Sequence, residues 1–590
     1  MRRRRRREAS PARKRSISSG EQSFEEWIAN QPITKGEASN NFPFPVLDYL
    51  QIFYADDVVG EEDPKNIFGS SGLFESFVRP YIIFAVVLPL SFIVTKVGEI
   101  SRKFFAPSPE LHLARVEKVQ QAVKLNRKSG SKICTDRSPT ASHSVRNRDK
   151  SGYKKIPMRD LRCILGCTES SVTVEPGVTV GELTKFLIKR GKMLECTLEM
   201  EHATLGGLAM ATGMTTHSHV CGLIHDTVLS YDVVLAGGKL VHCTEDNKHS
   251  DLFYALPWSH GTLGLLVGLT LSIVPSQPYV CLKYTTFYSK DDFVDAYADV
   301  LTRDEPPFFA EAIVFSKNTA VIMEGELADK VDNTKGGLNT IGYYWKPWFF
   351  THVRDMLTKR GENRTGSFQE YIPIYDYLMR HDRSMCMTMP YVLPFGNHWL
   401  FRFLFGWLLP PNMALLKASH TSETREDSAR KQVYQDLGFP MKDLSTMIDA
   451  AHNLFEIYPL LCYPCKIPKK PGFLRGHSMG DNDADQNSQM FLNFGIYGVP
   501  KPIAMGRKYK TVTAVRGMEW LVRKVGGFQH TYCDSFQTKE EFAEMFDHEL
   551  WEKVRTKYGG KALFPGVYEK TRANDIDWHA WLEEEQSNKE

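Results

Sequence analysis

Between residues 170 and 275 the apolar positions follow a strand, a helix and further strands in a fixed order. Val172 opens a β-branched segment that ends in a Pro-Gly turn, the pattern of a strand and its turn. Thr179, with Glu182 three residues later, is a capping-box pattern that predicts the start of a helix. Two alternating segments then flank Gly237-Gly238, the spacing of a β-hairpin, and an apolar strand closes the region.

Beyond about residue 276 alternating segments are mixed with helical patterns. The alternation predicts strands over Tyr279–Phe287, Ala310–Phe315 and Ala320–Gly325. The longer-period segments predict helices over Lys290–Thr302, Val433–Leu454 and Lys539–Lys557. This mixture indicates an α+β fold in which helices cover an antiparallel sheet.

An uncharged window from Pro80 to Thr95 precedes the folded region. As a helix its sixteen residues would reach about 24 Å, less than the roughly 30 Å hydrocarbon core of a bilayer. A buried or hairpin helix is one reading, but aromatic flanks and Pro89 favour a membrane anchor, either a single span or a monotopic helix. Basic residues are more frequent after the window than before it, which predicts a cytosolic C-terminal body.

The chain has 590 residues and is 42% hydrophobic, enough to bury two cores. Nine of the first fifteen residues are Arg or Lys, whereas the net charge of the whole chain is only +3. This predicts a solvated or membrane-surface basic arm, with a nuclear address as the alternative, and no nucleic-acid-binding role for the folded part. The eleven cysteines have no regular spacing, as in a reducing compartment, and the histidines form no metal-ligand pattern.

The segment from Thr204 to Thr216 contains three glycines and no charge. Glycine lets backbone N–H groups approach a ligand, and a nest of such groups suits a pyrophosphate, although small residues also permit tight helix packing. A second glycine-rich loop follows Ser259. The candidate cofactor-binding residues are Thr204, Leu205, Gly206, Gly207, Leu208, Ala209, Met210, Ala211, Thr212, Gly213, Met214, Thr215 and Thr216 in the first loop, and Gly261, Thr262 and Gly264 in the second.

This order of elements resembles the FAD-binding domain of the vanillyl-alcohol-oxidase superfamily over about residues 110–275. Within that superfamily the chain is similar to the Diminuto-type delta-24 sterol reductases from about residue 75 to the C-terminus. The motifs that carry this similarity are Asp251-Leu-Phe-Tyr254, Pro257-Trp-Ser259, Lys346-Pro-Trp-Phe-Phe350, Pro394-Phe-Gly-Asn397 and Phe405-Gly-Trp407. His219 and Gly222 keep the places expected in that family and join the candidate cofactor-binding residues.

The resemblance implies four parts: a disordered basic extension over 1–70, a membrane-anchor helix over 71–106, a two-lobed FAD-binding domain over 107–275 and an antiparallel-sheet substrate domain over 276–590. It also implies FAD as cofactor, NADPH as transient reductant and a sterol as substrate. The expected location is the endoplasmic reticulum membrane, with the Golgi membrane as the alternative.

The family also implies saturation of an isolated side-chain double bond. Because no carbonyl polarises such a bond, hydride delivery must be coupled to proton donation by a well-placed acid. The candidates for that acid are Tyr497, Tyr532, Asp534 and His381, each of which also fits a purely structural role.

The chain departs from the family pattern where carboxylates are usual. Thr215, Thr388 and Val499 stand in place of expected Glu residues, and Leu198-Glu-Met-Glu-His202 stands in place of Pro-Glu-Leu-Asp-Asp. The segment from Cys134 to Pro139 lacks the glycine of the family. These changes predict a divergent member. They leave two alternatives: another flavin-linked oxidoreductase that uses a different substrate or dioxygen, and a catalytically silent, membrane-tethered sterol-binding protein.

Overall fold

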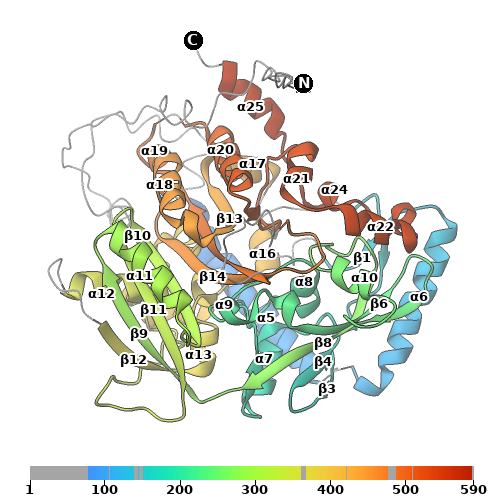
Figure 1. Cartoon of the computed structure of the whole chain (residues 1–590), viewed down its shortest axis with the longest axis horizontal. Coiled ribbons are helices and arrows are strands. Elements are labelled where there is room, and N and C mark those ends of the chain that lie inside the picture. The colour runs from blue at the N-terminus through green and yellow to red at the C-terminus, as the bar shows by residue number, and fades with distance from the viewer. Residues whose placement is uncertain are drawn as a thin grey trace, which may run out of the picture.

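The structure is a computed structural model that describes residues 78–104, 107–138, 144, 150–360, 367–419, 421–475, 487–507, 509–573 and 575–587 (Figure 1). The basic extension predicted over residues 1–70 lies outside the described residues.

A six-stranded antiparallel sheet occupies residues 164–275. Its order is β3-β4-β8-β6-β7, with β5 paired to β8. The strands are β3 (Ile164–Cys167), β4 (Ser171–Val174), β5 (Lys192–Leu194), β6 (Val228–Val234), β7 (Leu240–Cys243) and β8 (Leu265–Pro275). β6 and β7 pair on either side of Gly237-Gly238, and α7 (Val180–Ile188) begins with the capping box of Thr179 and Glu182, so both of these sequence predictions are confirmed.

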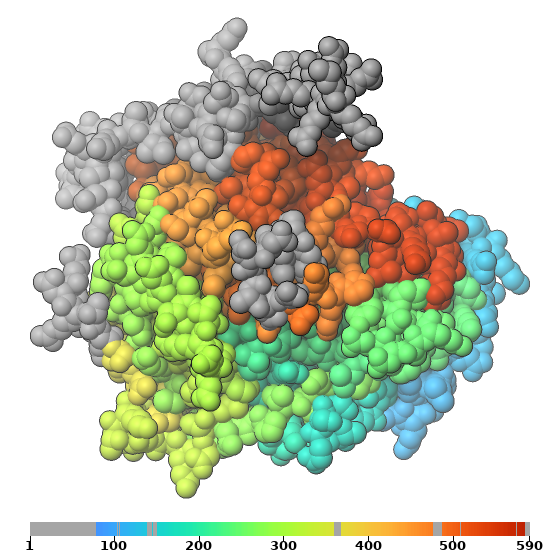
Figure 2. All heavy atoms as spheres, viewed as in Figure 1, coloured from blue at the N-terminus to red at the C-terminus, as the bar shows by residue number. Residues whose placement is uncertain are grey.

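A smaller layer packs beside this sheet. In it α6 (His112–Lys128) covers the parallel strands β1 (Ile133–Thr135) and β2 (Lys154–Ile156). Its core joins Val116 and Val119 of α6 to Leu563 and Phe564, which come from the other end of the chain. Figure 2 shows the red C-terminal residues lying against the green segment and beside the blue helix α6. The chain therefore returns to its first folded part after it has built the second.

An eight-stranded antiparallel sheet forms the second part, in the order β12-β9-β11-β10-β14-β15-β13-β16. Its strands are β9 (Tyr279–Phe287), β10 (Phe309–Ser316), β11 (Thr319–Ala328), β12 (Ser367–Pro373), β13 (Val433–Pro440), β14 (Leu460–Pro468), β15 (Ser488–Gly498) and β16 (Phe528–Gln529). The predicted antiparallel sheet is therefore confirmed. Three helices cover the sheet, with the second in contact with the other two: α11 (Lys290–Thr302), α18 (Leu444–Leu454) and α20 (Thr511–Lys524) (Figure 1).

Two of the predicted helices are wrong in part. Residues 433–440 form β13, which pairs with β15 along its whole length, and the helix begins only at Leu444. The strand requires a glycine at position 438, because a Cβ there would lie only 2.4 Å from the ring of Phe528 on the neighbouring strand. The helix predicted over Lys539–Lys557 is divided into α21 (Lys539–Met545) and α22 (Glu549–Lys557). The break follows from Asp547, whose N–H donates to the carbonyl of Phe473.

The predicted anchor is a continuous helix composed of α4 (Arg79–Ile82), a π-helical turn over Ile83–Val87 and α5 (Leu88–Phe104). The most apolar 18-residue window of its segment Arg79–Arg102 has a mean hydropathy of 2.0, and the helix is long and apolar enough to cross a membrane. The π-helical turn stands directly before Pro89, whose ring lacks an N–H and disturbs the regular hydrogen-bond ladder.

Candidate active site

The first glycine segment begins with Thr204 and continues as the short helix α8 (Leu205–Met210). Its two adjacent glycines have different roles. A Cβ at Gly206 would lie 2.3 Å from Cβ of Pro176, so this glycine is required by the packing of the fold. A Cβ at Gly207 would lie 3.0 Å from Oγ1 of Thr204 and 3.6 Å from the guanidinium of Arg137, which donates a 2.8 Å hydrogen bond to that hydroxyl. Gly207 therefore faces a cation.

The second glycine loop lies against the first. The N–H of His260 donates a 2.8 Å hydrogen bond to the carbonyl of Met210 at the end of α8. Gly261 has a φ of +72°, in the left-handed region that favours glycine, and a Cβ there would lie 3.6 Å from Nζ of Lys570. Each loop thus places a basic side chain beside a glycine, which suits a pyrophosphate. Neither Arg137 nor Lys570 was among the candidate cofactor-binding residues, although Arg137 lies in the segment 134–139 that was compared with the family.

Several buried polar atoms around these loops have no hydrogen-bond partner among the described residues: Oγ1 of Thr212, Oγ of Ser259 and both ring nitrogens of His530. The His530 ring stacks on Trp258, at the start of the second loop, with 5.5 Å between ring centroids. Burial lowers the pKa of His530 to about 3, so its imidazole is neutral and offers one donor and one acceptor. An unpaired buried polar atom costs about 1–3 kcal/mol, so these residues fit a polar ligand such as the FAD dinucleotide.

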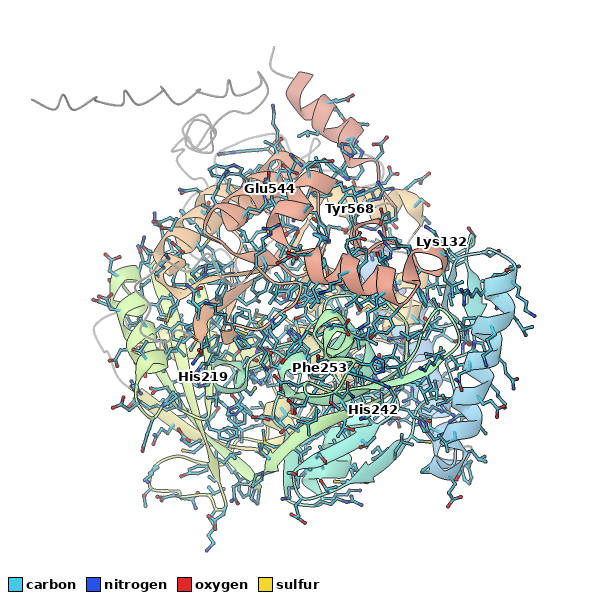
Figure 3. The ribbon with its side chains drawn as sticks, turned by 45° about the vertical axis from the view of Figure 1, so that its right-hand side comes forward. Lys132, His219, His242, Phe253, Glu544 and Tyr568 are labelled. Atoms are coloured by element: carbon cyan, nitrogen blue, oxygen red, sulfur yellow. The ribbon has the colours of Figure 1, made fainter. Side chains whose placement is uncertain are left out.

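Other predicted cofactor residues serve the packing of the fold. His219, on α9 (Ser218–Cys221), is buried and forms a 2.8 Å hydrogen bond to the carbonyl of Pro307, which precedes β10 (Figure 3). Thr262 accepts from the indole of Trp551 at 3.0 Å, and a Cβ at Gly264 would lie 2.4 Å from Val233. A Cβ at Gly222 would lie 2.7 Å from the Asp226 carboxylate.

Two of the four predicted acids meet at a third residue, Asp436. The hydroxyls of Tyr497 and Tyr532 both donate to Oδ2 of Asp436, the second at 2.7 Å. Asn493 donates to Oδ1 at 2.8 Å. The register explains this arrangement, because Asp436 on β13 faces Gly495 on β15, between Asn493 and Tyr497. The ring of Tyr497 folds across Gly495, where a Cβ would lie 2.7 Å from the phenol oxygen.

The carboxyl group is the acidic member of this cluster. Asp436 is only 2% exposed, and burial raises the pKa of its carboxyl to about 6 although the three donors oppose the shift. Burial, followed by the Asp436 charge, raises the pKa of both Tyr497 and Tyr532 well above the usual value of a phenol. As whole residues both tyrosines are half-buried, whereas Asp436 is buried.

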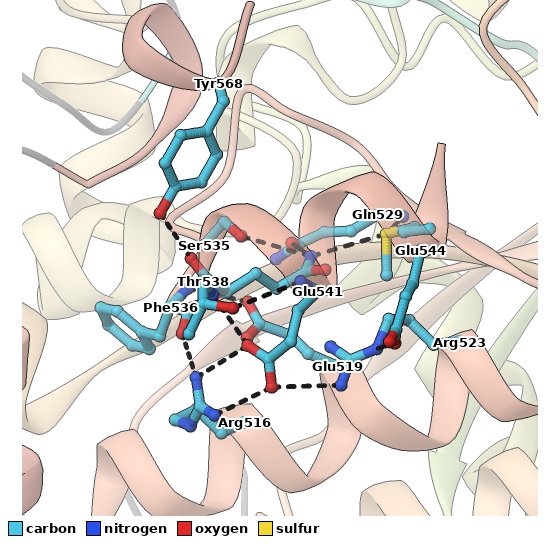
Figure 4. Close-up of polar contacts among 12 residues, drawn as sticks. Arg516, Glu519, Arg523, Gln529, Ser535, Phe536, Thr538, Glu541, Glu544 and Tyr568 are labelled. Carbon is cyan, nitrogen blue, oxygen red and sulfur yellow. Dashed lines mark hydrogen bonds and ion pairs between the residues drawn. The ribbon is translucent and has the colours of Figure 1, made fainter. Parts of the chain in front are cut away.

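The segment Gln529–Thr538 joins this cluster to the second glycine loop. Thr531 is hydrogen-bonded to Nε2 of His260, and Tyr532 follows it directly. The segment is fixed to α20 and α21 by a polar network (Figure 4). In it Glu519 accepts from the N–H of Phe536 at 3.0 Å, and Arg516 binds Glu541 at 2.9 Å. Through the consecutive residues Thr531 and Tyr532 the Asp436 cluster is therefore linked to the second glycine loop.

Asp534 lies in an ion pair and His381 in a separate hydrogen bond. Asp534 accepts from Arg425 at 2.7 Å. His381 binds the Glu311 carboxylate at 2.8 Å, and the neighbouring Arg380 links Glu311 to Glu199. This second network reaches the first glycine segment, because the hydroxyl of Thr215 donates to Glu199 at 3.3 Å.

A cavity of about 260 Å³ lies on another side of Trp258. Its walls include His225, Asp226, Tyr254 and Lys470 and none of the glycines of the two loops. It is too small for a dinucleotide, since small-molecule pockets usually measure about 300–1,000 Å³.

Comparison with known proteins adds to this geometry. Residues 111–244 match the family described as FAD binding domain. The chain is 37% identical to the delta(24)-sterol reductase of Macaca fascicularis over 78% of this chain and 87% of that protein. It is 34% identical to the delta(24)-sterol reductase of Pisum sativum over 84% of this chain and 91% of that protein.

A more distant relative by structure is a chitooligosaccharide oxidase, with a TM-score of 0.50 and 14% identity over 77% of this chain and 89% of that one. At that identity the likeness concerns the fold alone, and it agrees with the vanillyl-alcohol-oxidase-like fold expected from the sequence. The extent and identity of the sequence matches establish more: the chain belongs to the delta(24)-sterol reductase family of FAD-dependent oxidoreductases.

Proposed function

We propose that this chain saturates the side-chain delta-24 double bond of a sterol, with FAD as bound cofactor and NADPH as transient reductant. The substrate class and the reacting double bond are inferred from the names of the similar proteins, which are delta(24)-sterol reductases. The observation that carries the proposal is the Asp436 carboxyl, held by two tyrosines next to the second glycine loop.

The residues around the loops would hold FAD. Arg137 and Lys570 would neutralise the pyrophosphate, the glycine backbone would admit it, and the unpaired groups of Thr212, Ser259 and His530 would gain partners. Bound FAD, once reduced, supplies the hydride.

The proton would come from Asp436. An isolated double bond is a weak base, so the donor must be the strongest available acid in a dry site. Tyr497 and Tyr532 alone are poor donors because their pKa values are raised. The hydroxyl of Tyr497 would pass its proton to the substrate carbon while it takes one from the protonated Asp436 carboxyl to which it is hydrogen-bonded.

NADPH would bind only transiently. Both large sheets of the described residues are antiparallel, unlike the parallel sheet of a resident dinucleotide-binding fold. We propose domain boundaries at residues 107 and 275, supported by the separate sheets on either side of 275, with the segment around Leu563 and Phe564 returning to the first domain. We also place the protein at the endoplasmic reticulum membrane with its catalytic body in the cytosol.

The proposed divergence is supported by the surroundings of Thr388. Its hydroxyl donates to the carbonyl of Met385 at 2.7 Å and thus closes a turn. Met385, Cys386 and Met387 all have positive φ, between 47° and 68°, a conformation that non-glycine residues rarely adopt in succession. Thr388, which stands where a carboxylate is expected in the family, thus stabilises a strained turn in this chain.

Single-turnover reduction tests the proposal. Purified, FAD-loaded protein is reduced with NADPH without oxygen and then mixed with a delta-24 sterol. We expect flavin reoxidation with formation of one saturated sterol per flavin. Reoxidation only by dioxygen would favour the oxidase alternative, and sterol binding without turnover would favour the silent binder.

The rate constant for sterol saturation should depend on pH through Asp436. Only the protonated carboxyl donates, and its pKa is about 6. The rate constant should therefore be constant below about pH 6 and fall about tenfold per pH unit above it. Stopped-flow measurement of flavin reoxidation by sterol from pH 5 to 8 checks this, and a rate that rises with pH would contradict the assignment.

A further inference from the structure

The N-terminal helix lies on the folded body along one of its faces. Its residues Ile83, Val87, Leu88 and Ser91 are almost fully buried. They recur at the spacing of a single helical face. The rest of the helix is largely uncovered, since only 22% of its apolar window is buried.

The buried side packs against the segment Pro394–Leu408, which contains α15 (Trp399–Phe405). Phe84 contacts Phe401 and Phe405, with ring centroids 5.5 and 5.0 Å apart. Phe92 meets Trp407 edge-on at 4.8 Å. Detaching the helix would expose these rings, at about 1.5–3 kcal/mol for each buried side chain. A helix that leaves the body to span a bilayer would lose all of these contacts.

The uncovered side continues onto α15 and the neighbouring aromatic turn. We call this surface the apolar face. Its exposed side chains are Tyr81, Ile82, Val86, Leu90, Ile93, Val94, Val97, Ile100 and Phe104 of the helix, Trp399, Leu400, Phe403, Leu404, Phe405 and Trp407, and Tyr343, Tyr344 and Trp345. Figure 1 shows α5 running across the back of the body rather than projecting from it. Soluble proteins rarely expose a contiguous apolar surface of this extent.

Two observations identify the occupant as lipid. The apolar face has five Trp and Tyr side chains outside the helix, the residues enriched where a bilayer meets water. A groove of about 380 Å³ between the helix and Trp407 is lined only by apolar residues, among them Ala85, Pro89 and Leu408. Charged side chains stand only toward the two ends of the helix: Arg79 at its start, and toward its other end Lys96, which pairs with Glu99, and Arg102, which pairs with Glu182. Acyl chains fit this groove and a protein partner with polar side chains does not.

We propose that the helix lies in the plane of one leaflet and that the whole apolar face, α15 included, docks the protein monotopically. This rests on the membrane association of the proposed function and replaces the single span with an in-plane arrangement. Arg79, at the start of the helix, lies close enough to Tyr434 for its charge to act on that phenol, and Tyr434 is two residues from Asp436 on β13. The start of the helix therefore lies near the strand that carries the proposed proton donor.

Topology distinguishes the two arrangements. Full-length protein with an epitope at each end is incorporated into sealed microsomes and treated with protease. An in-plane helix leaves both epitopes on the same side, so both are cleaved. Protection of the N-terminal epitope together with cleavage of the C-terminal one would demonstrate a span and overturn the proposal.

Phe403→Glu tests the part played by α15. Phe403 is 65% exposed on the apolar face, and Leu125 on α6 is 68% exposed elsewhere, so Leu125→Glu is the matched control. Binding to phosphatidylcholine vesicles with one fifth phosphatidylserine should fall roughly tenfold or more for Phe403→Glu and stay unchanged for the control. Equal binding by both variants would refute docking through α15. Flavin content and sterol reduction in detergent should be normal in both variants, which separates a failure of docking from a failure of the proposed reaction.

Discussion

Replacement of Asp436 by Asn is expected to slow sterol saturation by about 10²–10⁴-fold, the usual cost of losing a general acid. The amide keeps the volume of the carboxyl and can still accept from Tyr497 and Tyr532, but it has no proton to give at neutral pH. Flavin content and the rate of flavin reduction by NADPH should stay normal. Single-turnover mixing of the reduced protein with sterol measures the effect, and the residual rate should lose its dependence on pH near 6.

Two further variants test whether the slower rate of Asp436→Asn arises from the loss of proton donation. Tyr497→Phe should slow the same step by a comparable factor if the phenol passes the proton, with flavin reduction intact. Asp534→Asn breaks the ion pair with Arg425 and should lower the melting temperature while the pH profile of the rate stays the same. If Asp436→Asn turned over sterol at the wild-type rate, the proton donor would have to be sought elsewhere.

Gly207→Val is expected to yield folded protein without FAD. A Cβ at this position points toward Thr204 and Arg137, so the valine methyl groups would fill the space next to the guanidinium where we place the pyrophosphate. The flavin absorbance per mole of purified protein should fall to near zero while the circular dichroism spectrum is retained.

Two other glycines serve as controls. A Cβ at Gly166, in β3, would have no neighbouring atom within 4 Å, so Gly166→Val should keep its flavin. Gly206→Ala should instead lower the stability of the fold, because its Cβ would clash with Pro176. Full flavin absorbance in Gly207→Val would show that the pyrophosphate lies somewhere else.

Local patterns predicted much of the first folded part. The capping box at Thr179, the hairpin at Gly237-Gly238 and the two glycine segments each depend on a few neighbouring residues, so their structure can be inferred from spacing. Such patterns carry little information on contacts between distant segments. Lys570 approaches Gly261 from more than three hundred positions further along the chain.

The Asp436 cluster could not be predicted from the sequence for a second reason. Residues 433–440 are buried on both faces of the sheet and therefore lack the alternation that marks a strand. Interpreted as a helix, the segment gave no reason to place Asp436 opposite Gly495 or between Asn493 and Tyr497. Two of its hydrogen-bond partners, Tyr497 and Tyr532, were recognised as candidate acids, but the carboxyl that they share was not.

The return of the C-terminal segment to α6 has a consequence for biosynthesis. Phe564 and Leu563 complete the core under α6, and Lys570 completes the second glycine loop. A ribosome that has translated the first three hundred residues has therefore made every glycine of the proposed cofactor site but not the C-terminal residues that pack around it. If FAD binds there as proposed, its stable loading has to wait until the last turns of the chain emerge, and truncation near residue 560 is expected to yield protein without flavin.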